Sequence, residues 1–277
     1  MSRRAPVEPT RTILAMGGGG FTMEPNNPLL DDYLLTLSPA ARPKILFLPT
    51  ASGDTPAQIN AFYDRYGGRE CVPRHVSLFR LDALDGSLEE VVSAQDIVYV
   101  GGGSLRNLLA IWRAHELDRI LVAAWRRGVV MAGLSAGAMC WFEGGVTRSG
   151  GTPEPIAGLG LLPGSLSVHA DGQPERLPVF LDCVKRGELP GGWAADDGVG
   201  LLFGGAQLER LVSSRPGATA ERVDAIAGEL VRRRLEPELL GADERREPAM
   251  DDDVRELRRV QRLRGQMTGE RHRFGDL

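Results

Sequence analysis

Short apolar runs alternate with stretches of helical periodicity through the first half of the chain. Strand-like runs occupy residues 12–16, 44–48, 74–79, 96–100 and 128–133. Apolar residues recur at helical spacing over residues 29–37, 56–66, 87–93 and 105–124. Continuous apolar strands are typical of parallel sheets that are buried on both faces, and their alternation with helices indicates βαβ units. The pattern therefore predicts an α/β fold with a doubly wound, mostly parallel sheet flanked by helices.

The second half of the chain differs from the first in composition and in the pattern of its apolar runs. Residues 150–165 are rich in glycine and proline and are expected to form a loop, and two more apolar runs follow at 198–203 and 209–214. From residue 242 onward the chain is densely charged and carries only a narrow apolar stripe. We expect one domain over residues 1–241, built on a single sheet. A charged extension over residues 242–277 should then form a surface helix or stay disordered.

Composition narrows the function classes. The chain has 277 residues, with 33 lysines and arginines against 37 acidic residues, for a formal net charge of −4. This small negative net charge argues against non-specific electrostatic binding to nucleic acid or anionic lipid. No apolar run reaches the roughly 18–20 residues that a membrane span requires. The three cysteines form no CxxC pair, and their odd number without a secretory leader favours a reducing, cytoplasmic location.

The sharpest local motif is the G-x-S-x-G pattern at residues 133–137. It follows an apolar strand and precedes a helix-compatible stretch, so Ser135 would sit on a strained strand-to-helix turn with its hydroxyl exposed. The Ala136 N–H would then point toward a forming oxyanion from the start of the helix. Because glycine, serine and alanine are common residues, a purely structural turn is the competing interpretation.

A serine nucleophile needs a base, and the chain has four histidines. His75 lies in an expected strand, His115 in a helical stretch and His272 in the charged tail. His169 follows an apolar run where the chain breaks into a loop, so elimination makes it the candidate base. Taken alone, a loop histidine is more often structural.

The acid that orients the histidine is harder to choose. The available carboxylates after the serine are Glu143, Glu154, Asp171, Asp196 and Asp197. The last two precede an apolar run and also fit a plain turn. An acid placed there gives the chain order Ser, His, Asp, which disfavours an ordinary α/β-hydrolase, whose order is Ser, acid, His.

Two glycine clusters end strands, at residues 17–20 and 101–103. The second offers N–H donors for half of an oxyanion hole, or else makes only a tight turn. Neither cluster completes a P-loop, and the first lacks the full dinucleotide-binding context. No H-E-x-x-H or other metal spacing occurs, so no metal or cofactor is expected.

Four segments, in one order, resemble peptidase family S51, which contains peptidase E (aspartyl dipeptidase) and cyanophycinase. They are VYVGGGSLRNLL at 98–109, GLSAGAMCW at 133–141, LGLLPGSLSVHADG at 159–172 and ADDGVGLLF at 195–203. The resemblance implies a class I glutamine amidotransferase-like fold and a metal-free serine mechanism. It implies Ser135 as nucleophile, His169 as base, Asp197 as acid, and the Gly102 and Ala136 amides as oxyanion donors.

The same resemblance suggests a substrate. Peptidase E prefers an N-terminal aspartate and binds its side chain with arginine, for which Arg176 is the candidate. We therefore expect a serine peptidase that hydrolyses short peptides, above all dipeptides beginning with aspartate. A small peptide is the only expected ligand, without nucleic acid or membrane, and a homodimer is left open. The alternatives are a cyanophycinase-like or isoaspartyl-peptide hydrolase, or a catalytically silent amidotransferase-like binding protein.

Three departures from the family pattern bear on this expectation. Ser104 stands where the family often has asparagine, and Arg148 lies in the segment where some relatives carry an aspartate. The histidine stands between Val168 and Ala170 instead of between proline and an aromatic residue. Any role of the family's aspartate is therefore in doubt here.

Overall fold

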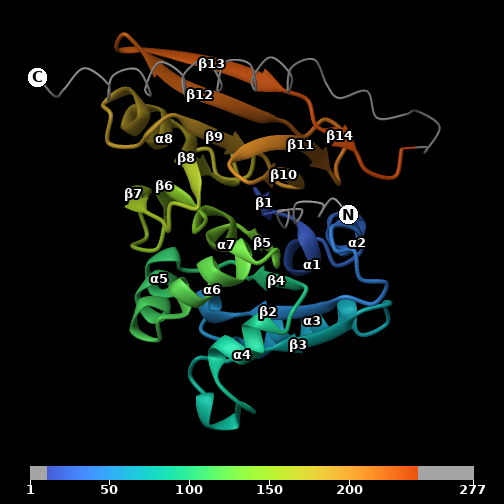
Figure 1. The fold of residues 1–277 in the computed structure, drawn as a ribbon. Coiled ribbons are helices and arrows are strands. Elements are labelled where there is room, and N and C mark those ends of the chain that lie inside the picture. Colours follow the sequence, from blue (N-terminus) through green and yellow to red (C-terminus); the bar gives the residue numbers. More distant parts are fainter. Residues whose placement is uncertain (1–10, 243–277) are drawn as a thin grey trace, which may run out of the picture.

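The strands of residues 11–242, which the computed structural model describes, divide between two sheets (Figure 1). The larger sheet has, in spatial order, β14 (Glu238–Leu239), β11 (Gln207–Ser213), β10 (Val199–Gly204), β1 (Thr12–Met16), β5 (Val130–Leu134), β4 (Ile97–Val100), β2 (Lys44–Leu48) and β3 (Val72–His75). From β1 to β3 all neighbours are parallel, whereas β10 is antiparallel to β1 and β11 to β10. The predicted doubly wound, mostly parallel sheet is confirmed in this part of the chain.

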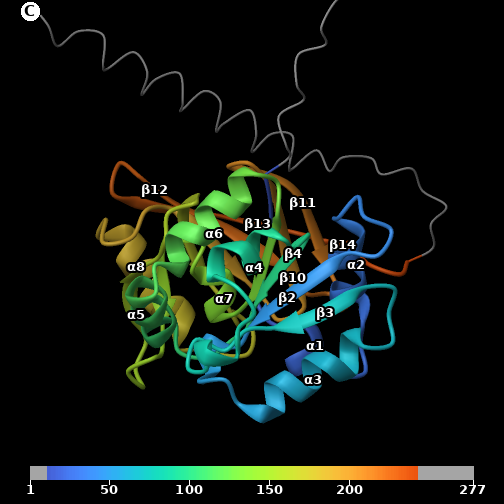
Figure 2. The same cartoon turned by 60° about the horizontal axis from the view of Figure 1, so that its bottom comes forward.

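Helices cover both faces of the larger sheet (Figure 2). Successive strand residues point to opposite faces, so Ile13 and Leu14 of β1 belong to different buried clusters. One face packs against α4 (Leu88–Ser93), α5 (Leu105–Ala114), α6 (Leu117–Arg126) and α7 (Ala136–Met139). The other packs against α1 (Gly20–Met23), α2 (Leu29–Thr36) and α3 (Pro56–Tyr66). Two short 3-10 helices, η1 (Thr50–Ser52) and η2 (Leu81–Ala83), lie in connections.

The second sheet corrects the expectation of a single sheet. Its order is β13 (Glu229–Leu235), β12 (Ala220–Ile226), β9 (Gly192–Ala195), β8 (Leu162–Ser167), β6 (Phe142–Thr147) and β7 (Glu154–Ala157). Helix α8 (Arg176–Lys185) packs on it. The prediction of a loop over 150–165 is wrong, because this segment contains β7 and the start of β8. Glycine lets β8 fit, because a Cβ at Gly164, whose φ is +89°, would lie 2.6 Å from the Gly191 carbonyl oxygen.

The single helix expected over 105–124 is also wrong, because α5 and α6 are separate helices. The break falls at Glu116, whose φ is +54°. The buried Leu117 follows the buried Trp112 by five positions, a step that does not keep both side chains on one helix face. The reversal lets each helix turn its own apolar side to the sheet.

The predicted 242–277 extension lies almost wholly outside the described residues, so it stays a prediction. No helix in the described part of the chain is long and apolar enough to cross a membrane.

Candidate active site

Ser135 stands between the end of β5 and the start of α7, as the motif predicts. Its backbone is in an unusual conformation, with φ 53° and ψ −115°. The flanking glycines are required by close packing: a Cβ at Gly133 would lie 2.1 Å from the Gly137 carbonyl oxygen, and one at Gly137 would lie 2.3 Å from that of Val100. This turn holds the serine hydroxyl out from the carboxyl edge of the sheet.

His169 and Asp197 meet Ser135 at this edge. The Nε2 atom of His169 lies 2.9 Å from Ser135 Oγ, and its Nδ1 atom lies 2.5 Å from Asp197 Oδ1. Both side chains are buried. The Asp197 N–H donates to Asp171 Oδ1 at 2.8 Å, which fixes the start of the Asp197 turn. The three side chains thus form a continuous hydrogen-bonded chain from carboxylate to hydroxyl.

The five acidic candidates separate clearly by their partners. Asp197 alone among them contacts His169 in the described part of the chain. The other four bind elsewhere: Glu143 accepts from the Gly164 N–H, Glu154 pairs with Arg106, Asp171 accepts from Asp197 N–H, and Asp196 accepts from Thr219. His75 contacts Tyr63 instead of any of these carboxylates.

The glycine segment after β1 joins the three parts of the site, a role that the sequence did not reveal. The carbonyls of Met16, Gly17 and Gly18 accept hydrogen bonds from the N–H groups of Ser135, His169 and Gly198, at 3.1, 3.2 and 3.2 Å respectively. Residues 16–18 are therefore the common backbone scaffold of the site. In the sequence, the repeated glycines at 17–20 are the only sign of this role, and their pattern alone does not distinguish such a scaffold from a phosphate-binding loop.

Gly18 also lies directly against the side chains of Asp197 and His169. A Cβ built on it would lie 1.9 Å from Asp197 Oδ1 and 2.8 Å from His169 Nδ1. No other residue type fits at this position without displacing the Asp197 carboxylate.

Gly102 and Ala136, the expected oxyanion donors, both flank Ser135. A Cβ at Gly102 would lie 3.4 Å from Ser135 Cβ. The Gly102 N–H has no acceptor among the described residues, and Ala136 opens α7, so its N–H has no acceptor within the helix. The loop of Gly102 is fixed by Gln58, whose Nε2 donates to the Gly102 carbonyl at 3.3 Å. Two amide donors are thus available beside the hydroxyl.

Arg176 lies at the start of α8 and is buried. Its guanidinium donates to the Val146 carbonyl at 3.2 Å and to Gln173 Oε1 at 2.7 Å, while its Nε has no partner among the described residues. Burial, together with the positive charge of Arg148, lowers the pKa of Arg176 to about 10, against the opposing charges of Glu175 and Asp197. No carboxylate pairs with Arg176 in the described chain; Glu175 pairs with Arg148 instead, at 2.7 Å.

The thiol of Cys140, five residues after Ser135 in the chain, packs as an apolar side chain. Cys140 is fully buried, its Sγ donates to the Gly137 carbonyl at 3.1 Å, and burial raises its pKa well above the usual value. Within residues 11–242, no group of three histidine, cysteine or acidic side chains could hold a metal ion.

Comparison with known proteins now decides the family. The model of peptidase family S51 matches residues 13–211. The chain belongs to peptidase family S51. It is therefore a peptidase, and the resemblance drawn from the four motif segments is confirmed.

Individual relatives of the S51 peptidase agree with this membership. It is 49% identical over 213 residues to "Uncharacterized peptidase YgaJ" of Bacillus subtilis (strain 168), which covers 77% of this chain and 92% of that protein. A crystal structure of a peptidase from an acI-B1 actinobacterium superposes with a TM-score of 0.62 at 17% identity, over 82% of this chain and 94% of that one. A "Putative Peptidase E Protein" from Listeria monocytogenes EGD-e superposes with a TM-score of 0.51 at 12% identity, over 82% of this chain and 100% of that one. The last two show a shared fold.

Proposed function

We propose that this S51 peptidase is a serine enzyme that hydrolyses short peptides through Ser135, His169 and Asp197. The observation that carries the proposal is the chain of contacts from Asp197 through His169 to Ser135 Oγ, at 2.5 and 2.9 Å. A base within hydrogen-bond reach of a hydroxyl, itself oriented by a third group, is the arrangement that activates a serine.

The first half of the reaction follows from the hydrogen bonds. Ser135 Oγ attacks the peptide carbonyl carbon while His169 Nε2 takes the hydroxyl proton, and Asp197 stabilises the imidazolium through Nδ1. The carbonyl oxygen, now negative, is held by the Gly102 and Ala136 amides. The tetrahedral species collapses when the C–N bond breaks and His169 passes its proton to the leaving amine. An acyl-Ser135 ester remains.

The second half repeats these roles with water. His169 takes a proton from the water molecule that attacks the ester carbonyl, and the same amides hold the oxyanion. When the C–O bond to Ser135 breaks, the proton returns to Ser135 Oγ and the acid product leaves. Electrostatic stabilisation of the oxyanion is commonly the largest single contribution to such rates.

Arg176 gives the proposed preference for acidic substrates a physical basis. Its guanidinium is buried without a paired carboxylate in the described chain, and a buried cation without a counter-ion is costly. A substrate carboxylate is the group that would offset this cost, because arginine binds carboxylates in a charge-assisted, often bidentate manner. We therefore propose dipeptides with N-terminal aspartate as substrates.

The decisive test compares the wild type with Ser135→Ala on a panel containing Asp-Leu, Leu-Leu, β-aspartyl-Leu and cyanophycin-type β-Asp-Arg. We expect Asp-Leu to be the best substrate, and Ser135→Ala to lose at least about 10⁴-fold in turnover, because the triad acts as a unit. A serine-reactive fluorophosphonate should label Ser135 in the wild type only. Equal turnover by both proteins would rule out the serine mechanism, and preference for a β-linked substrate would replace the proposed specificity.

Arg176→Met tests the acidic preference separately. Methionine keeps the length and apolar stem of the side chain but removes the charge, so kcat/KM for Asp-Leu should fall about 10²-fold, the equivalent of a charge-assisted pair. Activity on Leu-Leu should hardly change. If both substrates lose equally, Arg176 supports the fold instead of the substrate.

We also propose a cytoplasmic location. Cys71, Cys140 and Cys183 are all unpaired and buried, which suits a reducing compartment.

A further inference from the structure

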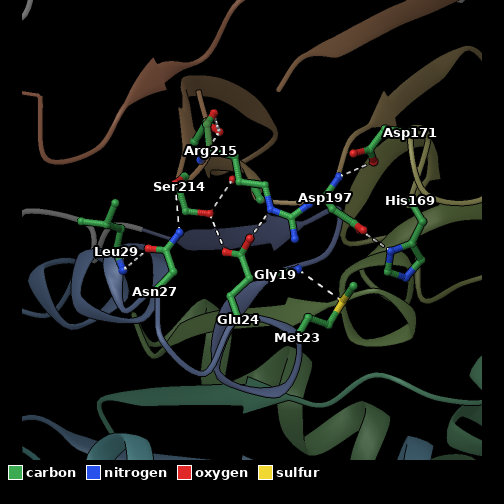
Figure 3. Close-up of polar contacts among 12 residues, drawn as sticks. Gly19, Met23, Glu24, Asn27, Leu29, His169, Asp171, Asp197, Ser214 and Arg215 are labelled. Atoms are coloured by element: carbon green, nitrogen blue, oxygen red, sulfur yellow. Dashed lines mark hydrogen bonds and ion pairs between the residues drawn. The ribbon is translucent and has the colours of Figure 1, made fainter. Parts of the chain in front are cut away.

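A second charged cluster, formed by Glu24, Ser214 and Arg215, lies next to the proposed triad (Figure 3). Glu24 is only 8% exposed and uses both carboxylate oxygens. Its Oε2 accepts from Ser214 Oγ at 2.8 Å, and its Oε1 accepts from Arg215 Nε. Asn27 donates to the Ser214 carbonyl at 3.0 Å. The cluster therefore ties the segment after α1 to the segment after β11, about 190 residues later in the chain.

This cluster is built against the Asp197 turn. The Ser214 N–H donates to the carbonyl of Gly198, the residue after Asp197, at 2.9 Å. A Cβ at Gly198 would lie 2.8 Å from Arg215 Cγ, and one at Gly19 would lie 3.2 Å from both Glu24 Oε2 and Gly198 Cα. The stem of Arg215 and the carboxylate of Glu24 thus pack directly behind the turn that carries Asp197.

The guanidinium of Arg215 lies on the side of the cluster that faces Asp197 (Figure 3). The hydrogen bond to Glu24 raises the pKa of Arg215, and the negative charges of Glu24, Asp197 and Asp171 add to this effect. Arg215 is within electrostatic reach of Asp197, but it forms no ion pair with that residue in the described chain. Its charge therefore acts through space on Asp197, the carboxylate that contacts His169.

The other charges around the pair lie on different elements. Asp171 holds the Asp197 N–H, Asp196 is tied to Thr219, and Arg176 approaches from α8 with the Arg148–Glu175 pair beyond it. Among these, Arg215 is distinguished by a buried carboxylate that fixes its Nε and by direct packing on the residue next to Asp197.

We propose that Arg215, held in place by Glu24, is a positioning residue for the Asp197–His169 pair and sets the pH range over which His169 can accept the serine proton. The inference rests on the proposed function of the triad. The positive charge of Arg215 favours the ionised Asp197 and opposes a second positive charge on His169. Glu24 partly cancels that charge and keeps the guanidinium at a fixed place.

This arrangement predicts opposite effects for the two partners. Arg215→Gln removes a positive charge, so the imidazolium becomes easier to form, and the acid limb of the pH profile should move up by roughly half a pH unit. Glu24→Gln leaves the Arg215 charge uncompensated, so the acid limb should move down by a similar amount. Arg215→Lys keeps the charge and should stay within about 0.2 pH unit of the wild type.

The experiment measures the rate of Ser135 labelling by a fluorophosphonate from pH 4.5 to 9 in these variants at low salt. Arg210→Gln is the matched control, because Arg210 also pairs with a carboxylate, that of Glu238, and forms no hydrogen bond or ion pair with the triad residues in the described chain. The imidazole signals of ¹⁵N-histidine-labelled protein, assigned with His169→Gln, give a second titration that needs no activity. Opposite shifts for Arg215→Gln and Glu24→Gln are the expected result.

Shifts in the same direction, or none beyond the Arg210→Gln control, would overturn the inference. If Glu24→Gln does not fold, Arg215→Gln against Arg215→Lys decides: equal profiles for the two overturn the proposal. A wild type that is not labelled at Ser135 defeats the proposed function, whereas the NMR titration still tests the charge effect on His169. The two failures are therefore distinguishable.

Discussion

Two charged clusters contact the short segment 17–24, and they differ in how far their polar groups are paired and buried. On one side Gly18 touches Asp197 and His169, and Glu24 holds Arg215. On the other side a Cβ at Gly20 would lie 2.7 Å from Tyr99 Oη and 3.5 Å from Asp31 Oδ1. The same run of glycines therefore separates the candidate active site from a charged cluster in the interior.

The interior cluster closes on itself. Asp31 is fully buried, accepts from Tyr66 Oη at 3.0 Å and pairs with Arg65 Nε at 3.2 Å. Arg65 in turn donates to the carbonyls of Glu24 and Pro25 at 3.0 and 2.8 Å. These groups join α1, α2 and α3, so the cluster fixes the helices beneath the glycine segment.

The second cluster, at the carboxyl edge of the larger sheet, contains Asp197, His169, Glu24 and Arg215, and we call it the edge cluster. It is less completely paired than the interior cluster. Ser135 is partly exposed, the Gly102 amide has no acceptor in the described chain, and the Arg215 side chain is 38% exposed. In the interior cluster Asp31, Arg65 and Tyr66 contact one another, although the nearby Tyr99 Oη has no hydrogen-bond partner in the described chain. At the edge, the Gly102 N–H has no acceptor in the described chain. The difference suggests that a perturbation at the edge should reduce activity, and one in the interior should reduce stability.

Gly18→Ala, compared with Gly20→Ala, gives the largest expected effect. The Gly18 backbone lies outside the left-handed region, so the new methyl group conflicts only with the side chains of Asp197, at 1.9 Å from Oδ1, and His169, at 2.8 Å from Nδ1. Displacing that carboxylate should lower kcat/KM about 10²–10³-fold, since misplacements of about 1 Å are costly. Gly20 has φ +61°, and alanine there should destabilise the fold by about 1–2 kcal/mol with only a few-fold loss of activity.

The measurements are dipeptide kinetics and urea unfolding on both variants. An active Gly18→Ala protein with unchanged kcat/KM would break the contrast between the two sides. So would a Gly20→Ala protein that keeps its stability but loses activity as strongly as Gly18→Ala.

The sequence predicted those parts of the site that depend on local pattern. Ser135 follows from a strand, a turn and small flanking residues, and these features need no knowledge of the rest of the chain. Asp197 could not be separated from the other four acidic residues by pattern, because its contact with His169 depends on where β9 ends relative to β8. The four-segment resemblance selected it instead, and that resemblance covers both elements.

What the sequence did not reveal comes from contacts between distant segments. Glu24 and Arg215 look like ordinary surface charges in sequence, and only the packing of β11 beside β10 brings them together. The glycines at 17 and 18 matter because three remote N–H groups converge on that backbone. The second sheet is hard to predict for two reasons. Glycine or proline interrupts β6, β7 and β8 and favours turns when each segment is read alone, and β12 and β13 are rich in charged residues instead of forming apolar runs.

The interior cluster yields the smallest predicted effect, which concerns stability and its dependence on pH. Burial raises the pKa of Asp31 from 3.8 to about 6, against the opposing influence of Arg65. Between about pH 4 and pH 6 the folded protein therefore binds a proton that the unfolded chain has released, so stability falls as pH rises through this window. Over the whole window, the titration of Asp31 lowers the free energy of unfolding by on the order of 3 kcal/mol.

Asp31→Asn isolates this contribution, because asparagine does not titrate. The unfolding free energy of the wild type minus that of Asp31→Asn should decrease from pH 4 to pH 7 and then level off, as measured by urea unfolding. Asp32→Asn is the matched control: it removes a negative charge from the adjacent position, where Asp32 is 48% exposed and pairs with Arg69. A difference that stays constant with pH, or that rises toward neutrality, would mean that Asp31 is ionised throughout. The interior cluster would then be a permanently charged network, and its contrast with the open edge would lie in solvent access alone.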